Sequence, residues 1–110
     1  IIMELKNKFE NRKFKFNNKD YNNKSYAQPY YDLVKDVLEG AHGEFKTTRD
    51  TSVALGKTVC LNYEDIPESA LKYNLYKPLH DVYVITNKDV KGFNKAIQRI
   101  GKILEVEVEI

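Results

Sequence analysis

Residues 82–110 carry the pattern that most restricts the fold of this chain. Residues 82–85 are all β-branched or aromatic, which is typical of a strand buried on both faces. Four apolar residues spaced three, four and three apart then predict one buried helix face: Val90, Phe93, Ile97 and Ile100. Gly101 fits the left-handed position that ends a helix. Residues 105–110 alternate glutamate with Val or Ile, which predicts a strand with these residues inward: Val106, Val108 and Ile110.

Strand, helix and strand within so few residues indicate a βαβ unit. Upstream, we predict strands at Met3–Leu5, at Phe14–Phe16 and in residues 44–48, 52–55 and 58–63, with a hairpin turn at Gly56-Lys57. Residues 17–24 are predicted to be a loop. One helix should begin at a Ser25–Gln28 capping box and end near Gly40, and a short helix should begin at Asp65.

These elements define the expected fold. We expect a single α+β domain over residues 1–110. It should contain a single mixed or antiparallel five- to six-stranded sheet, two longer helices and one short helix, and it should close with the C-terminal βαβ unit.

Composition narrows the class of protein. The single cysteine, Cys60, excludes an internal disulfide, and no apolar run reaches the roughly 18 residues that span a membrane. We therefore expect a cytoplasmic protein that makes no membrane contact. His42 and His80 lie far apart in the sequence, so no metal site is predicted. Gly56-Lys57-Thr58 lacks the additional glycine of a phosphate-binding loop, and we predict no cofactor and no catalytic residue.

Charge is unevenly placed along the chain. Residues 1–24 hold seven basic and three acidic residues, and the remainder holds eleven basic and thirteen acidic residues. Aromatic residues are interleaved with these cations up to Tyr31. Cations neutralise phosphates and aromatic faces stack on bases, so this mixture is typical of nucleic-acid binding. We predict a small non-catalytic protein that contacts nucleic acid or a nucleoprotein through these residues: Lys6, Lys8, Arg12, Lys13, Lys15, Lys19, Tyr21 and Lys24.

Two alternatives stay open. The lysine-, asparagine- and tyrosine-rich composition suggests an AT-rich genome, and a phage or mobile-element product that inhibits a host protein is the first alternative. Its contacts would be tyrosines and residues 73–79. The second is a small enzyme acting on phosphodiesters or nucleotides, with Arg49-Asp50 and His80-Asp81 as its group.

Two further expectations accompany these functions. Arg49 and Thr48 lie in a hydroxyl-rich segment and are candidates for binding an anion. A homodimer is a further alternative, because the predicted strand at residues 105–110 can pair with the same strand of a second copy.

Overall fold

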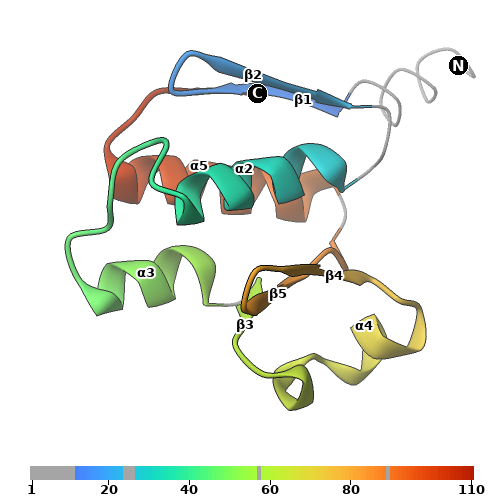
Figure 1. Cartoon of the computed structure of the whole chain (residues 1–110). Coiled ribbons are helices and arrows are strands. Elements are labelled where there is room, and N and C mark those ends of the chain that lie inside the picture. The colour runs from blue at the N-terminus through green and yellow to red at the C-terminus, as the bar shows by residue number, and fades with distance from the viewer. Residues whose placement is uncertain (1–11, 24–26, 57, 89) are drawn as a thin grey trace, which may run out of the picture.

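The computed structural model describes residues 12–23, 27–56, 58–88 and 90–110. Its elements are β1 (Arg12–Phe16), β2 (Lys19–Asn23), α2 (Gln28–Leu38), α3 (Thr48–Leu55), β3 (Val59–Cys60), the 3₁₀ helix η1 (Tyr63–Asp65), α4 (Glu68–Lys72), β4 (Tyr76–Leu79), β5 (Val82–Ile85), α5 (Val90–Leu104) and β6 (Val108–Glu109). Figure 1 shows three layers: the β1–β2 hairpin, then α2 beside α5, then α3 with β3, β5 and β4.

The strands of the described residues form two antiparallel sheets of three strands, ordered β2-β1-β6 and β3-β5-β4. The α+β class is confirmed, and the prediction of a single five- to six-stranded sheet is wrong. The physical reason is that α2 and α5 lie between the two groups of strands and cover both with apolar side chains. The prediction of a C-terminal βαβ unit is also wrong, because α5 connects β5 and β6, which belong to different sheets.

The predicted loop over residues 17–24 is instead the turn and second strand of a hairpin. Asn17 and Asn18 have φ values of 50° and 66°, the left-handed conformation that a two-residue hairpin turn requires. Asparagine tolerates this conformation better than most residues do. On the inner face of the hairpin, Phe14 lies opposite Tyr21 and stacks on it with ring centroids 5.1 Å apart.

The predicted strands at residues 44–48 and 52–55 are wrong, because residues 44–47 form no strand and α3 occupies residues 48–55. Thr47 caps the helix, and its Oγ1 accepts a hydrogen bond from the Asp50 backbone N–H at 3.0 Å. Ala54 and Leu55 on the helix are buried in the core. Gly56 caps the C-terminus in right-handed backbone and so lacks the positive φ of the predicted hairpin turn, and Lys57 lies outside the described residues.

Helices α2 and α5 form the centre of the molecule. Their side chains contribute most of the fully buried residues: Tyr30, Leu33, Val34, Ile97 and Ile100. The helix predicted to end near Gly40 is α2. The predicted apolar face of α5 is confirmed at Phe93, Ile97 and Ile100, and the Val90 side chain lies outside the described part of the chain. The capping box is wrong, because the N-cap is Ala27 with no side-chain hydrogen bond, and Ser25 lies outside the described residues. The helix start predicted at Asp65 is also wrong. Asp65 is the last residue of η1, and the N-cap of α4 is Pro67.

The end of α5 differs from the prediction at Gly101. The helix continues to Leu104, and Glu105 (φ 59°) takes the left-handed position. Gly101 is instead a close-packing site, since a Cβ there would lie 2.3 Å from Val108 Cγ2. Ile110 was predicted to face inward, but its side chain is 54% exposed.

The β3-β5-β4 sheet is covered on both faces. Val84 and Leu79 face α2, α3 and α5 and belong to the main core. On the opposite face, Ile85 packs with Ile66 and Ala70 in a second, small core under η1 and α4. The tyrosines of β4 and β5 lie on this second face.

Candidate functional site

The structure describes only part of the predicted nucleic-acid segment. Lys6, Lys8 and Lys24 lie outside the described residues. Arg12 and Lys13 belong to β1, but their side chains lie outside the described part of the chain. Three residues of the predicted site can therefore be placed: Lys15, Lys19 and Tyr21.

Lys15 lies on the outer face of the β2-β1-β6 sheet among carboxylates. It is half-buried and pairs in register with Asp20 on β2 and with Glu109 on β6. These residues line an open depression together with Phe14, Asn22 and Ile110. Because two carboxylates accompany one ammonium group, the described part of this surface is not basic.

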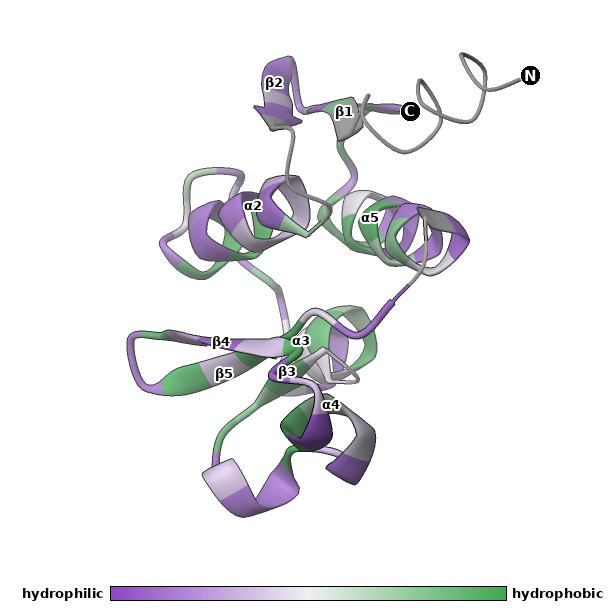
Figure 2. Ribbon diagram, turned by 90° about the vertical axis from the view of Figure 1, so that its right-hand side faces the viewer, coloured by the Kyte–Doolittle hydropathy of each residue, from purple (hydrophilic) through white to green (hydrophobic). Residues whose placement is uncertain are grey.

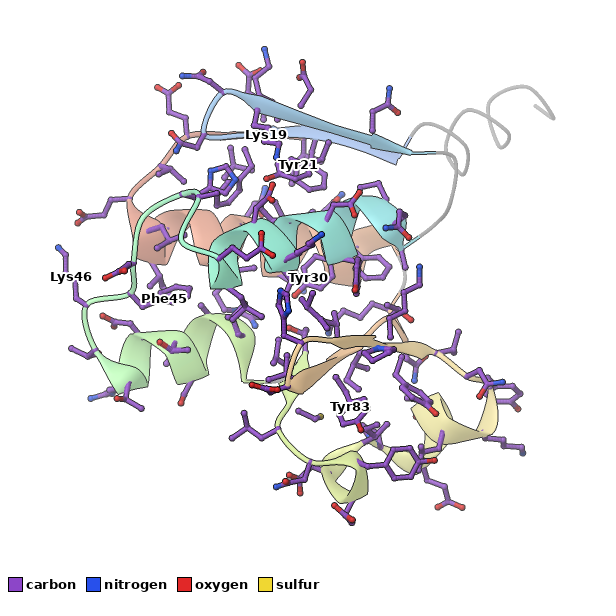
Figure 3. The ribbon with its side chains drawn as sticks, in the orientation of Figure 1. Lys19, Tyr21, Tyr30, Phe45, Lys46 and Tyr83 are labelled. Carbon is purple, nitrogen blue, oxygen red and sulfur yellow. The ribbon has the colours of Figure 1, made fainter. Side chains whose placement is uncertain are left out.

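Tyr21 is buried under the hairpin, with 4% of its surface exposed, so its ring is not available to stack on a base. Its hydroxyl lies 2.5 Å from Asp36 Oδ2 and 2.6 Å from His42 Nε2. The hydroxyl has one proton, which it donates to the carboxylate, and it accepts a hydrogen bond from Nε2–H. His42 Nδ1 then accepts from the Asn17 amide at 3.4 Å. Figure 3 shows Tyr21 between the hairpin and α2.

Titration of this network is governed by burial. Burial, and then Asp36, raise the pKa of Tyr21 well above its usual range. Burial and the charge of Lys19 lower the pKa of His42, against the opposing effect of Asp36. Burial also raises the pKa of Asp36, but hydrogen bonds from Lys19 and Tyr21 outweigh it and hold this pKa below its ordinary value.

Lys19 belongs to the same network. Its Nζ lies 2.5 Å from Asp36 Oδ2 and 5.2 Å from the centroid of the Tyr21 ring. The ammonium is thus paired with a carboxylate next to the turn of the hairpin. The network joins β2, α2 and the residues after α2, and we interpret it as an anchor of the hairpin. Sequence reasoning missed it because its members come from three separate segments.

The predicted enzyme group is not connected in the described structure. Arg49 and Thr48 are exposed in the first turn of α3, beside Asp50. His80 lies at the β4–β5 turn, where its Nε2 is 3.0 Å from Glu39 Oε1. None of the hydrogen bonds and ion pairs among the described side chains joins Arg49 or Asp50 to His80 or Asp81. The anion-binding role of Arg49 and Thr48 stays a prediction.

Metal and thiol chemistry receive no support from the described residues. Within residues 12–23, 27–56, 58–88 and 90–110, no group of three His, Cys, Asp or Glu side chains converges to hold a metal ion. The Cys60 thiol lies 3.6 Å from the Asp65 carbonyl oxygen, and burial raises its pKa. Among the described helices, none has the length and apolar character needed to cross a bilayer.

The most strongly basic described surface lies on α5. This helix contains four basic residues and no acidic residue: Lys91, Lys95, Arg99 and Lys102. Its exposed positions are spaced four, three and four apart and so form one stripe: Lys91, Lys95, Gln98 and Lys102. At 1.5 Å per residue the stripe is about 16 Å long. Figure 2 shows hydrophilic residues along the side of α5 that faces away from α2.

No carboxylate of the described residues lies within ion-pair distance of the cations of this lysine stripe. The ion pairs among the described residues involve Lys19, Lys46 and His80, and none involves a basic residue of α5. The opposite face of the helix packs into the main core through Phe93, Ile97 and Ile100. The fold therefore directs the stripe to solvent.

Comparisons with protein-family models, with curated proteins and with solved structures return no match for this chain. The described residues form a small α+β fold in which the charged residues of α5 are all basic.

Proposed function

We propose that this protein is a non-catalytic nucleic-acid-binding module that contacts the phosphate backbone through the lysine stripe of α5. The observation that supports this proposal is the spacing of Lys91, Lys95 and Lys102 on one exposed face of a helix without acidic residues. Cations held in a row neutralise successive phosphates and release bound counterions, which drives association. Gln98, within the stripe, is able to donate a hydrogen bond to a phosphate or a base edge.

The function class is the one predicted from the sequence, but the proposed contact surface is α5 instead of the N-terminal segment. The other described α-helices carry mixed charge: Asp32, Lys35 and Asp36 on α2, Arg49 and Asp50 on α3, and Glu68 and Lys72 on α4. The 3₁₀ helix η1 carries acidic residues only. An approaching polyanion is therefore attracted to one side of the described structure. The N-terminal cations outside the described residues stay candidates for additional contacts.

Charge reversal on α5 tests the proposal. Fluorescence anisotropy with a labelled 24-base-pair DNA duplex, and with the same sequence as RNA, should show binding by the wild-type chain at low salt. The K91E/K95E variant should bind both probes at least about 30-fold more weakly, since it removes two phosphate contacts and adds repulsion. The matched control is K35E/K72E, which makes the same change in net charge on exposed sites of α2 and α4.

Two results would overturn the proposal. One is equal weakening by both double variants, which would indicate a general effect of net charge. The other is binding of the wild type to anionic lipid vesicles without binding to either nucleic acid. The predicted alternatives, an inhibitor of a host protein and a phosphodiester-acting enzyme, stay predictions, as does the cytoplasmic location.

A further inference from the structure

Three tyrosines meet on the face of the β3-β5-β4 sheet that lies away from α2. Tyr63 comes from η1, Tyr76 from β4 and Tyr83 from β5. Their ring centroids are separated by 6.1, 5.9 and 6.2 Å, and the interplanar angles lie between 67° and 79°. Each ring therefore presents its edge to a neighbouring face. Figure 3 shows Tyr83 projecting from the sheet on this side. We name these three residues the tyrosine triad.

The triad is more exposed than a set of core aromatics. Tyr63 is 50% exposed, and Tyr76 and Tyr83 are half-buried over the small core formed by Ile66, Ala70 and Ile85. Leu61, two residues before Tyr63, is 72% exposed. An exposed apolar and aromatic surface of this kind is typical of a contact site.

Negative charge borders the triad. Glu64 and Asp65 follow Tyr63 on the same 3₁₀ helix, and Glu68 begins α4; all three side chains are exposed. Asp65 accepts a hydrogen bond from the Asn62 side chain at 3.3 Å, which holds its carboxylate at this surface. Carboxylates and the negative faces of aromatic rings both attract cations. Because the phosphates of nucleic acid would be repelled here, the surface selects a ligand of the opposite charge.

Other tyrosines of the chain already bind cations from within the molecule. Lys19 lies over Tyr21, Lys72 lies 5.4 Å from the centroid of Tyr73, and Lys77 lies 5.5 Å from that of Tyr31. None of these three lysines lies over the triad. Because the three rings also contact one another edge to face, their exposed parts, chiefly that of the half-exposed Tyr63, remain among the described residues for a cation supplied from outside.

We propose that the tyrosine triad and Glu64 bind an arginine side chain of a partner protein. The guanidinium group is planar and weakly hydrated, so it stacks on a tyrosine face at low desolvation cost and donates paired hydrogen bonds to a carboxylate. This site is separate from the lysine stripe of α5 and does not depend on the nucleic-acid proposal.

The test is a nuclear magnetic resonance titration of the full chain with a short glycine–arginine peptide. The control peptide has citrulline in place of arginine, which keeps the shape and removes the charge. The arginine peptide should shift the aromatic resonances of the triad and the Glu64 amide, and the citrulline peptide should not. The proposal is overturned if both peptides shift these resonances equally, or if the shifts lie elsewhere.

Substitutions separate ring stacking from structural support. Tyr83→Leu keeps an apolar side chain over the small core and should weaken peptide binding about 10-fold, whereas Tyr83→Phe keeps the ring face and should bind within about 2-fold of wild type. Tyr73→Leu is the matched control outside the triad. Unchanged amide shifts of Leu33 and Ile97, in the main core away from the triad, show that the fold is kept, and wild-type affinity of a folded Tyr83→Leu variant would refute the site.

Discussion

The hydroxyl of Tyr21 donates a hydrogen bond to Asp36 Oδ2 across 2.5 Å, and this contact connects the β1–β2 hairpin to α2. The Tyr21 side chain is buried. Among the described hydrogen bonds, only those from Lys19 and from this hydroxyl reach the charged Asp36 carboxylate. Hydrogen bonds to charged groups contribute more than neutral ones. The position of the first sheet relative to the helices should depend on this pair.

Removing the Tyr21 hydroxyl should destabilise the fold. Tyr21→Phe leaves His42 Nε2 without this partner and Asp36 with only its Lys19 contact, and we expect a loss of about 2 kcal/mol in the free energy of unfolding in urea. The control is Tyr31→Phe, whose hydroxyl donates to the Pro78 carbonyl at an exposed site. Equal effects of the two substitutions would show that the network does not anchor the hairpin.

Stability should fall as the pH decreases from 8 to 5, and His42 should be responsible. Burial lowers the pKa of folded His42 below its unfolded value of about 6.5. The unfolded chain therefore binds the proton first, so the neutral imidazole stabilises the fold fully above that pH and progressively less below it. Urea unfolding at successive pH values should show this decrease in the wild type and a flatter profile in His42→Gln. Parallel profiles would contradict the assignment.

A second acid transition should come from Asp36. Its folded pKa is held below the unfolded value of about 3.9, so its stabilising contribution is complete above that value and disappears as the pH falls through the folded pKa. Asp36→Asn should be less stable than wild type at neutral pH and should lose less stability between about pH 4 and pH 2. Thermal unfolding monitored by circular dichroism checks this, and an unaltered acid profile in the variant would rule it out.

Gly101 should resist substitution because of its packing against β6. A Cβ at this position would approach Val108 Cγ2 to 2.3 Å, so Gly101→Ala should cost about 1–3 kcal/mol despite the higher helix propensity of alanine. In a Val108→Ala background the obstacle is removed, and the same substitution should become neutral or stabilising. A double-mutant cycle in urea measures this coupling, and additive effects would show that α5 and β6 do not meet there.

Part of this structure follows from local sequence patterns. The apolar spacing of residues 90–100 predicted α5, and the β-branched run at residues 82–85 predicted β5, because these patterns reflect burial on one face of a helix and on both faces of a strand. Asn17-Asn18 also contained a usable pattern, since two adjacent residues that tolerate positive φ favour a hairpin turn over an open loop.

Other features depend on contacts that no local pattern records. The first turn of α3 is fixed by the Thr47 cap, which overrides the strand propensity of the threonines around it. The division into two sheets depends on where α2 and α5 pack. The tyrosine triad joins three elements that are separated in sequence. The lysine stripe, in contrast, was visible in the sequence as a helix with cations at helical spacing and no acid.

The salt dependence of DNA binding tests the central proposal most directly. Anisotropy titrations of a 24-base-pair duplex from 50 to 200 mM salt should give a slope of log K against log salt of about −3 for the wild type, since three or four cations contact phosphates. Lys95→Gln should reduce the magnitude of this slope by about 1, and Lys35→Gln should leave it unchanged. Binding that does not vary with salt, or an identical slope for Lys95→Gln and wild type, would contradict a role for the α5 stripe.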